Sequence, residues 1–328
     1  MANGEPAENP GINNVRSGSA AGRAGVSALG VRRRFGAVEA VRGMDFTAPS
    51  GAVTALIGPN GSGKTTLLLM LASLLAPDAG EVRIGGFDPT TDPGQVRSRV
   101  GWMPDTLGSW DSLTATEILL AMGAFYGMTV PAARARAAEL LETVHLSDLA
   151  DKPARVFSRG QQQRLSLARS LIHDPEVLLL DEPASGLDPG SRVDLRVLLR
   201  RLAAEGKTVV VSSHVLSELD EMADRAVFVA RGETVTTQSL ADAGAQPRWY
   251  TVRALDDGSL LRQLETLQVP HRMQGDDRRP AVQVRLTGEN AAAALLRSLV
   301  LADISVIAFA PAGGALEETY MSLDTDRR

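Results

Sequence analysis

Short apolar runs alternate with longer segments of helical periodicity over most of the chain. Continuous apolar runs occur at 52–58, 176–183 and 207–214, and such runs are typical of strands buried on both faces of a parallel sheet. The segments at 64–75 and 115–150 carry apolar residues at the spacing of helices. Buried strands that alternate with helices predict an α/β domain with a largely parallel sheet.

The pattern changes on both sides of this region. Residues 1–26 are rich in Gly, Ala, Asn and Ser and contain little to bury, which predicts a disordered tail. From residue 241 onward the expected elements follow the order β-α-β-β-α-β, which is the plan of a small split βαβ domain. We therefore expect a tail at 1–26, an α/β domain at 27–240 and a small α+β domain at 241–328.

Composition and charge narrow the class of protein. The 328 residues are 44% hydrophobic and 22% charged, which is ordinary for a globular protein of about two domains. The net charge of -5 does not favour a nucleic-acid surface, so no nucleic acid is expected as a partner. The chain has no cysteine, which excludes thiolate metal sites. Its longest apolar run is about half of the ~20 residues that a membrane-spanning helix needs, and its first residues lack a secretory signal. We expect a cytoplasmic chain.

The segment GPNGSGKT at 58–65 matches the phosphate-loop pattern G-x-x-x-x-G-K-[ST] between an expected strand and an expected helix. Its glycines would let backbone N–H groups converge on phosphate oxygens. Lys64 would reach the terminal phosphates of a nucleotide, and the Thr65 hydroxyl would hold Mg²⁺. The alternative is a structural Gly-rich turn. The candidate nucleotide-binding residues here are Gly58, Pro59, Asn60, Gly61, Ser62, Gly63, Lys64, Thr65 and Thr66.

Two acids end the apolar run at 176–183. A carboxylate at the end of a buried strand needs a cation, water or another partner, because burying an unpaired charge is costly. A bound nucleotide would supply such partners: Asp181 would bind Mg²⁺, and Glu182 would polarise the water that attacks the γ-phosphate. The alternative is a solvent-exposed strand end at which Asp-Glu-Pro begins a turn.

In this order along the chain, the phosphate loop, the segment FSRGQ at 157–161 and the acidic strand end resemble the ATP-binding subunits of ABC transporters. The resemblance covers about 27–240, with a helical subdomain at about 106–172. It implies that Ser158, Gly160 and Gln161 stand for the signature sequence of that family, and that Arg159 replaces a glycine, as in drug and antibiotic exporters. Gln162 and Gln163 lie beyond the signature and are expected on the helix surface or near the hinge of the subdomain.

The same resemblance assigns four further positions. His214 resembles the switch histidine that contacts the γ-phosphate, and Asp188 ends the segment SGLD, which resembles the loop that crosses the dimer seam. Phe35 stands where the family has an aromatic ring that stacks on adenine. A lone histidine after a strand and an apolar ring before one are also common as ordinary surface or core residues. Asp105 replaces the usual Gln or Glu that touches Mg²⁺ and the membrane partner, and its shorter side chain puts that role in doubt.

The resemblance implies an ATP-binding and ATP-hydrolysing subunit that energises an ABC exporter. Two copies would form a head-to-tail dimer, in which the phosphate loop of one chain and the signature of the other enclose each ATP. The dimer would drive a separate transmembrane permease at the cytoplasmic face of the membrane. The implied cofactors are ATP and Mg²⁺. The expected catalytic residues are Glu182, His214 and Lys64, and the expected metal ligands are Thr65, Asp181 and Asp105.

Two other functions remain open at this point. The first is a soluble ABC ATPase that acts on a cytoplasmic machine such as the ribosome or DNA, and the second is a regulatory or scaffold protein with negligible turnover. The C-terminal region carries no motif of its own. Its segment ALEETYMSL at 315–323 is similar to the terminal helix of subunits in the exporter branch.

Overall fold

The computed structural model describes residues 24–106, 108, 110, 112–240, 247–274, 281–314, 316, 317, 319 and 320. Residues 1–23 of the expected N-terminal tail lie outside this part of the chain. None of the helices in the described ranges has the length and apolar composition that a membrane span requires.

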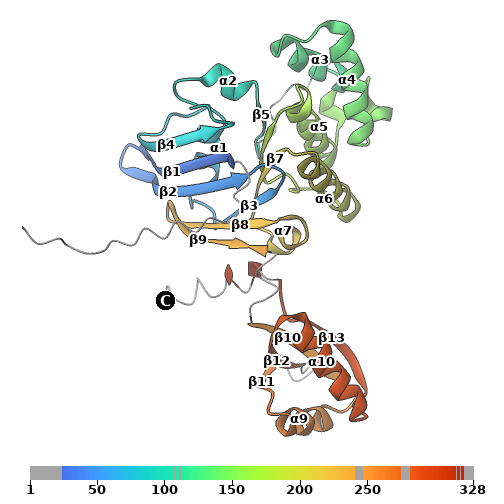
Figure 1. Ribbon diagram of the computed structural model, residues 1–328. Coiled ribbons are helices and arrows are strands. Elements are labelled where there is room, and N and C mark those ends of the chain that lie inside the picture. The colour runs from blue at the N-terminus through green and yellow to red at the C-terminus, as the bar shows by residue number, and fades with distance from the viewer. Residues whose placement is uncertain are drawn as a thin grey trace, which may run out of the picture.

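A six-stranded sheet forms the centre of the first domain (Figure 1). Its strands pair in the order β5-β6-β7-β3-β8-β9, all parallel except the last. The central strands β6, β7 and β3 are buried at every position, which explains their uninterrupted apolar sequences. The expected α/β fold is confirmed. The bounds are β5 (Val100–Met103), β6 (Val177–Asp181), β7 (Thr208–Ser213), β3 (Val53–Ile57), β8 (Arg225–Ala230) and β9 (Glu233–Ser239).

A second, antiparallel sheet covers one side of this centre. It consists of β2 (Val38–Pro49), β1 (Ala24–Phe35) and β4 (Ala79–Ile84), paired in that order. Helix α1 (Lys64–Leu71) shares one buried cluster with both sheets. The first turn of α1 is thereby fixed next to the end of β3. The short helix α2 (Pro93–Arg97) precedes β5.

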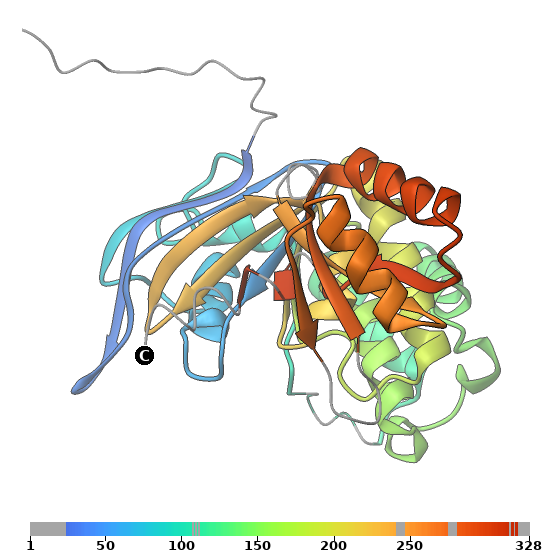
Figure 2. The same ribbon diagram turned by 90° about the horizontal axis from the view of Figure 1, so that it is seen from below.

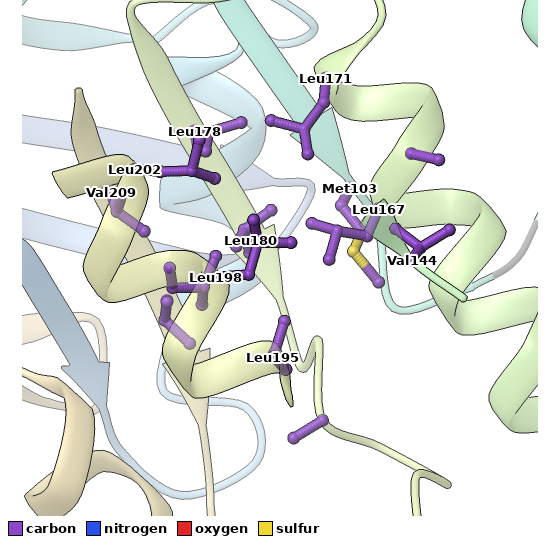
Figure 3. Close-up of a cluster of buried hydrophobic side chains, with 14 of the residues drawn as sticks. Met103, Val144, Leu167, Leu171, Leu178, Leu180, Leu195, Leu198, Leu202 and Val209 are labelled. Carbon is purple, nitrogen blue, oxygen red and sulfur yellow. The ribbon is translucent and has the colours of Figure 1, made fainter. Parts of the chain in front are cut away.

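Helices pack on the other side of the central sheet. In one buried cluster, leucines of α5 and α6 meet residues of β5, β6 and β7 (Figure 3). The labelled side chains include Leu167 of α5, Leu180 of β6 and Leu198 of α6, which lie close together in this cluster. The packing therefore fixes α5 relative to the carboxyl end of β6. The helices against the sheet are α5 (Arg159–Leu171), α6 (Pro189–Ala204) and α7 (Leu216–Met222). Helices α3 (Ala115–Phe125) and α4 (Val130–Thr143) pack against each other and against α5, beyond it in Figure 1, and single 3-10 turns lie at Ser147–Leu149 and Ala154–Val156.

The C-terminal elements form a small antiparallel sheet with two helices, below β8 and β9 in Figure 1 and in front of the first domain in Figure 2. The expected order β-α-β-β-α-β is confirmed, and the strands pair as β11-β12-β10-β13. Alternate residues of β10 and β12 share a core with leucines of both helices, so both helices cover one face. The elements are β10 (Pro247–Ala254), α9 (Asp257–Thr266), β11 (His271–Gln274), β12 (Ala281–Thr287), α10 (Gly288–Leu301) and β13 (Val306–Pro311).

The chain returns to the first domain after β13. Leu316 is fully buried in the same cluster as Leu219 of α7, and its N–H donates to Asp220 Oδ1 at 3.0 Å. Thr319 Oγ1 donates to Gln238 Oε1 of β9 at 2.7 Å. Residues 316, 317, 319 and 320 are helical, and the other positions of the expected terminal helix at 315–323 lie outside the described part of the chain.

Candidate nucleotide-binding site

Four neighbouring parallel strands end at one edge of the central sheet, and each leads into a predicted site residue. β3 leads to Gly58, β6 ends at Asp181, β7 is followed by His214, and β5 is followed, two residues on, by Asp105. In open α/β sheets, ligands bind outside the carboxyl ends of the strands. The sheet order therefore collects residues that are far apart in the sequence at the edge where a ligand is expected.

The phosphate loop connects β3 to α1. Gly61 and Gly63 have φ of 78° and 99°, which favour glycine because a Cβ atom is strained there. A Cβ on Gly58 would lie 2.3 Å from Val229 O, and one on Gly63 would lie 2.7 Å from Ala40 O, whereas one on Gly61 meets nothing within 4 Å. The outer glycines thus pack against the protein, and the loop between them presents an open side. This shape fits a bound phosphate chain.

Lys64 begins α1 and folds back across its own loop. Its Nζ donates to Gly58 O at 2.7 Å and to Pro59 O at 3.2 Å, and only 7% of the residue is exposed. Burial lowers the pKa of Lys64, while the charges of Glu182 and Asp181 act in the opposite direction. A buried ammonium at the centre of a loop that also presents glycine N–H groups fits an anionic ligand such as a nucleoside triphosphate.

Asp181 is hydrogen-bonded to hydroxyl groups on both sides. Thr65 Oγ1 donates to Asp181 Oδ2 at 2.8 Å, and Ser212 Oγ donates to Asp181 Oδ1. Carboxylate and hydroxyl oxygens are suitable Mg²⁺ ligands, and nucleotide-bound Mg²⁺ keeps waters and phosphate oxygens as its other ligands. That donor set fits Mg²⁺. No group of three or more His, Asp or Glu residues within the described ranges could hold a metal ion by itself.

Asp105 is placed differently from Thr65 and Asp181. It is exposed past the end of β5, the strand beside β6. Among the residues described, no hydrogen bond or ion pair joins it to Thr65 or Asp181. The structure therefore brings two of the three expected metal ligands into contact and leaves Asp105 at the same sheet edge without such a contact.

Glu182 adopts an unusual backbone conformation beside His214. Its φ is 50°, in the left-handed region that residues other than glycine rarely adopt. The Glu182 N–H donates to Ser212 O and Ser212 Oγ, both at 3.1 Å. His214 Nδ1 lies 2.9 Å from Glu182 Oε2. The structure thus brings the expected general base and the expected switch histidine into direct contact.

Gln163 was expected on the helix surface or near the hinge, and the surface expectation is wrong. Its residue exposure is 2%, and its Nε2 donates to Glu182 O at 2.9 Å. A signal for this burial exists in the sequence, because Gln163 lies four residues before Leu167 and seven before Ser170, on the buried stripe of α5. A glutamine on an apolar stripe needs a hydrogen-bond partner, and the Glu182 carbonyl provides it.

The signature residues form the start of α5. Ser158 is the N-cap: its Oγ accepts from the Gln161 N–H at 3.3 Å, and its own N–H donates to Gln161 Oε1 at 2.8 Å. Arg159 Nη2 donates to Ser185 Oγ at 3.0 Å. A Cβ on Gly160 would lie 3.3 Å from Gly186 O. Within one chain, Arg159 and Gly160 therefore contact the segment that follows Glu182.

Asp188 and Phe35 occupy the ends of other elements. Asp188 is the N-cap of α6 and accepts hydrogen bonds from Ser191 Oγ at 2.6 Å and Ser191 N at 3.0 Å, which lower its pKa. Phe35 ends β1 with 48% of the residue exposed, and the Arg33 guanidinium lies 5.0 Å from the ring centroid. An exposed ring of this kind is able to stack on a planar ligand.

These features define a P-loop nucleotide-binding domain: a glycine loop between the buried strand β3 and a helix, a buried lysine, and an aspartate at the end of β6, the next strand but one in the same sheet, that accepts a hydrogen bond from the threonine of the loop. Residues 41–185 match the family model described as ABC transporter. The chain is 32% identical over 305 residues to the daunorubicin/doxorubicin resistance ATP-binding protein DrrA of Streptomyces peucetius, with 91% of this chain and 92% of that protein covered. The chain belongs to the ABC transporter family, and the resemblance drawn from the sequence is confirmed.

Other relatives match about two thirds of the chain. The Nod factor export ATP-binding protein I of Burkholderia lata is 40% identical over 205 residues, covering 62% of this chain and 67% of that protein. Among solved structures, a dimeric ATP-binding cassette in a post-hydrolysis state, bound to ADP and Pi, aligns with a TM-score of 0.61 and 29% identity. The alignment covers 66% of this chain and 98% of that structure. The first domain therefore has the fold of an ABC ATPase cassette.

Proposed function

We propose that the chain binds and hydrolyses ATP with Mg²⁺ and energises an ABC exporter whose membrane-spanning part is a separate permease. The observation that carries this proposal is the grouping of Lys64, the Thr65–Asp181 pair and the Glu182–His214 pair at one edge of the sheet. Relatives named for drug resistance and for Nod factor export support the export direction. The chain would then lie at the cytoplasmic face of the membrane, held there by the permease.

The residues of the site have separate roles in binding the phosphates and in moving the proton of the attacking water. Lys64 and the N–H groups of the loop bind and orient the phosphates, and Thr65 and Asp181 would hold Mg²⁺, which neutralises phosphate charge when it is bound. Glu182 accepts the proton of the attacking water at its carboxylate. A carboxylate only accepts hydrogen bonds, so the proton between Glu182 and His214 belongs to His214 Nδ1. His214 therefore orients the base, and its other ring nitrogen, Nε2, would face the γ-phosphate.

A head-to-tail homodimer would complete each site. Ser158 and Gly160 lie at the N-terminus of α5, where free N–H groups and the helix dipole favour an anion. Within one chain, the described contacts of Arg159 and Gly160 at this helix start are with the segment after Glu182, so the anionic ligand of the helix start would belong to the second copy. The dimeric cassette bound to ADP and Pi supports this arrangement.

Ser158→Ala is expected to leave ATP binding by the monomer intact and to lower kcat by about 10²-fold, as the loss of one transition-state donor does in other enzymes. The substitution also removes a helix cap, so thermal unfolding is measured beside binding and hydrolysis. Thr114→Ala is the matched control, because Thr114 forms the same capping box at the start of α3, outside the site. Equal kcat values for the two variants would contradict a role of Ser158 in hydrolysis.

The proposed association with a permease is tested by purifying the tagged chain from its own host in mild detergent and identifying the proteins that accompany it. A membrane protein with several spans, in equal amount, is the expected result. Recovery of a ribosome or DNA complex in its place would contradict the proposal and favour the soluble ABC ATPase.

A further inference from the structure

The start of α5 and the segment that follows β6 touch at three places. Gln163 Nε2 donates to Glu182 O at 2.9 Å, and Arg159 Nη2 donates to Ser185 Oγ at 3.0 Å. A Cβ on Gly160 would approach Gly186 O to 3.3 Å, which shows how closely the two backbones pass. The helix that begins with the signature is therefore in contact with the segment that carries the proposed base.

The contact from Gln163 falls on a residue whose backbone needs support. A glutamate with φ of 50° is disfavoured, because its Cβ crowds the neighbouring carbonyl in the left-handed region. Such a conformation persists only where the surroundings hold it. Ser212 holds the N–H of Glu182, Gln163 Nε2 and the Ser185 N–H (3.1 Å) donate to its C=O, and His214 holds its carboxylate. Of these hydrogen bonds in the described part of the chain, the one from Gln163 comes from α5.

We propose that Gln163 is a positioning residue for ATP hydrolysis, because it holds Glu182 in the conformation that directs the carboxylate toward the attacking water. The proposal rests on the proposed ATPase function. Gln163 is 2% exposed and contacts the backbone of Glu182, so it acts on the base without touching the nucleotide. Because buried leucines anchor α5 to the core, the first turns of this helix hold the Gln163 side chain at a fixed place beside Glu182.

The direct test is Gln163→Met, which keeps the length and bulk of the side chain and removes the donor. We expect kcat to fall by about 10-fold to 10²-fold and the KM for ATP to change by less than about 2-fold, because only the orientation of the base is lost. Gln162→Met is the matched control, since Gln162 is the neighbouring residue of the same helix and lies outside the signature. Equal kcat for the two variants, with both folded by thermal unfolding, would overturn the proposal.

A second pair of variants separates positioning from a general structural role. In a chain that already carries Glu182→Gln, adding Gln163→Met is expected to change the residual single-turnover rate by less than about 2-fold, because residues that act as a unit are not additive. A further drop of the same size as in the wild-type background would show that Gln163 acts on something other than Glu182, and would overturn the proposal.

The pH profile gives an independent readout. In Gln163→Glu, an ionised carboxylate has no hydrogen to donate to Glu182 O, whereas the protonated form has one. Burial of that carboxyl raises its pKa. The kcat of this variant, relative to wild type at the same pH, is therefore expected to rise as the pH falls from about 8 to about 6. A ratio that stays near one shows a carboxyl that is protonated and donates at every pH tested, whereas a ratio that is constant and well below one would count against the hydrogen bond. Absence of Lys64-dependent hydrolysis by the wild type would overturn the proposed function and this inference together, whereas normal wild-type hydrolysis with an unaffected Gln163→Met overturns this inference alone.

Discussion

Glu182→Gln is expected to lower kcat for ATP hydrolysis by at least about 10³-fold, because an amide does not accept the proton of the attacking water. The Glu182 carboxylate is hydrogen-bonded to His214, and its backbone to Ser212 and Gln163, so the phosphate loop keeps its own contacts in the variant. ATP should therefore still bind. Since hydrolysis no longer removes it, the ATP-bound dimer should accumulate. Steady-state hydrolysis and the mass of the protein in solution with ATP are the two measurements.

The control for this variant is Glu176→Gln. Glu176 directly precedes β6, at the end of the strand opposite Glu182, and its exposed carboxylate pairs with Arg99 at 3.5 Å. The same chemical change there should leave hydrolysis near the wild-type rate. Normal hydrolysis by Glu182→Gln would exclude Glu182 as the base, and failure of that variant to dimerise with ATP would count against the head-to-tail dimer.

Lys64→Ala is expected to abolish ATP-dependent turnover, with a loss of at least about 10²-fold in kcat/KM from the missing charge on the terminal phosphates. The ammonium of Lys64 bridges Gly58 O and Pro59 O at the centre of the loop, where burial strengthens its attraction to an anion. The affinity for ATP, measured by titration, reports the loss of binding, and the rate of phosphate release reports the loss of turnover.

Lys207→Ala is the control for Lys64→Ala. Lys207 also donates to a backbone carbonyl, Pro175 O at 2.8 Å, and pairs with Asp174 at 2.7 Å. It precedes β7 and so lies at the sheet edge opposite the site. Normal hydrolysis by Lys207→Ala is expected. If the wild type in its assembled complex hydrolyses no ATP in a Lys64-dependent manner, the scaffold function without turnover is favoured.

The local pattern of apolar and polar residues was sufficient to predict the strands, the helices and the phosphate loop. The buried strands β3, β6 and β7 have continuous apolar sequences because both faces of each strand are covered, so their pattern is readable without knowing the partners. The segment Gly58–Thr66 is contiguous, and its strand, glycines, lysine and helix are all specified within a few residues. The sequence by itself therefore determined the α/β class, the β-α-β-β-α-β order of the second domain and the location of the candidate phosphate site.

Only the tertiary structure decided which distant residues meet. Thr65 and Asp181 are 116 residues apart, and their hydrogen bond exists because β6 and β3 are both parallel members of one sheet. The positive φ of Glu182 and its support by Gln163 depend on how α5 packs against the end of β6. Periodicity places Gln163 on the buried stripe of its helix, but the group that this stripe faces is set by packing between segments far apart in the chain. The same holds for Leu316, whose burial beside α7 follows from the return of the chain after the second domain.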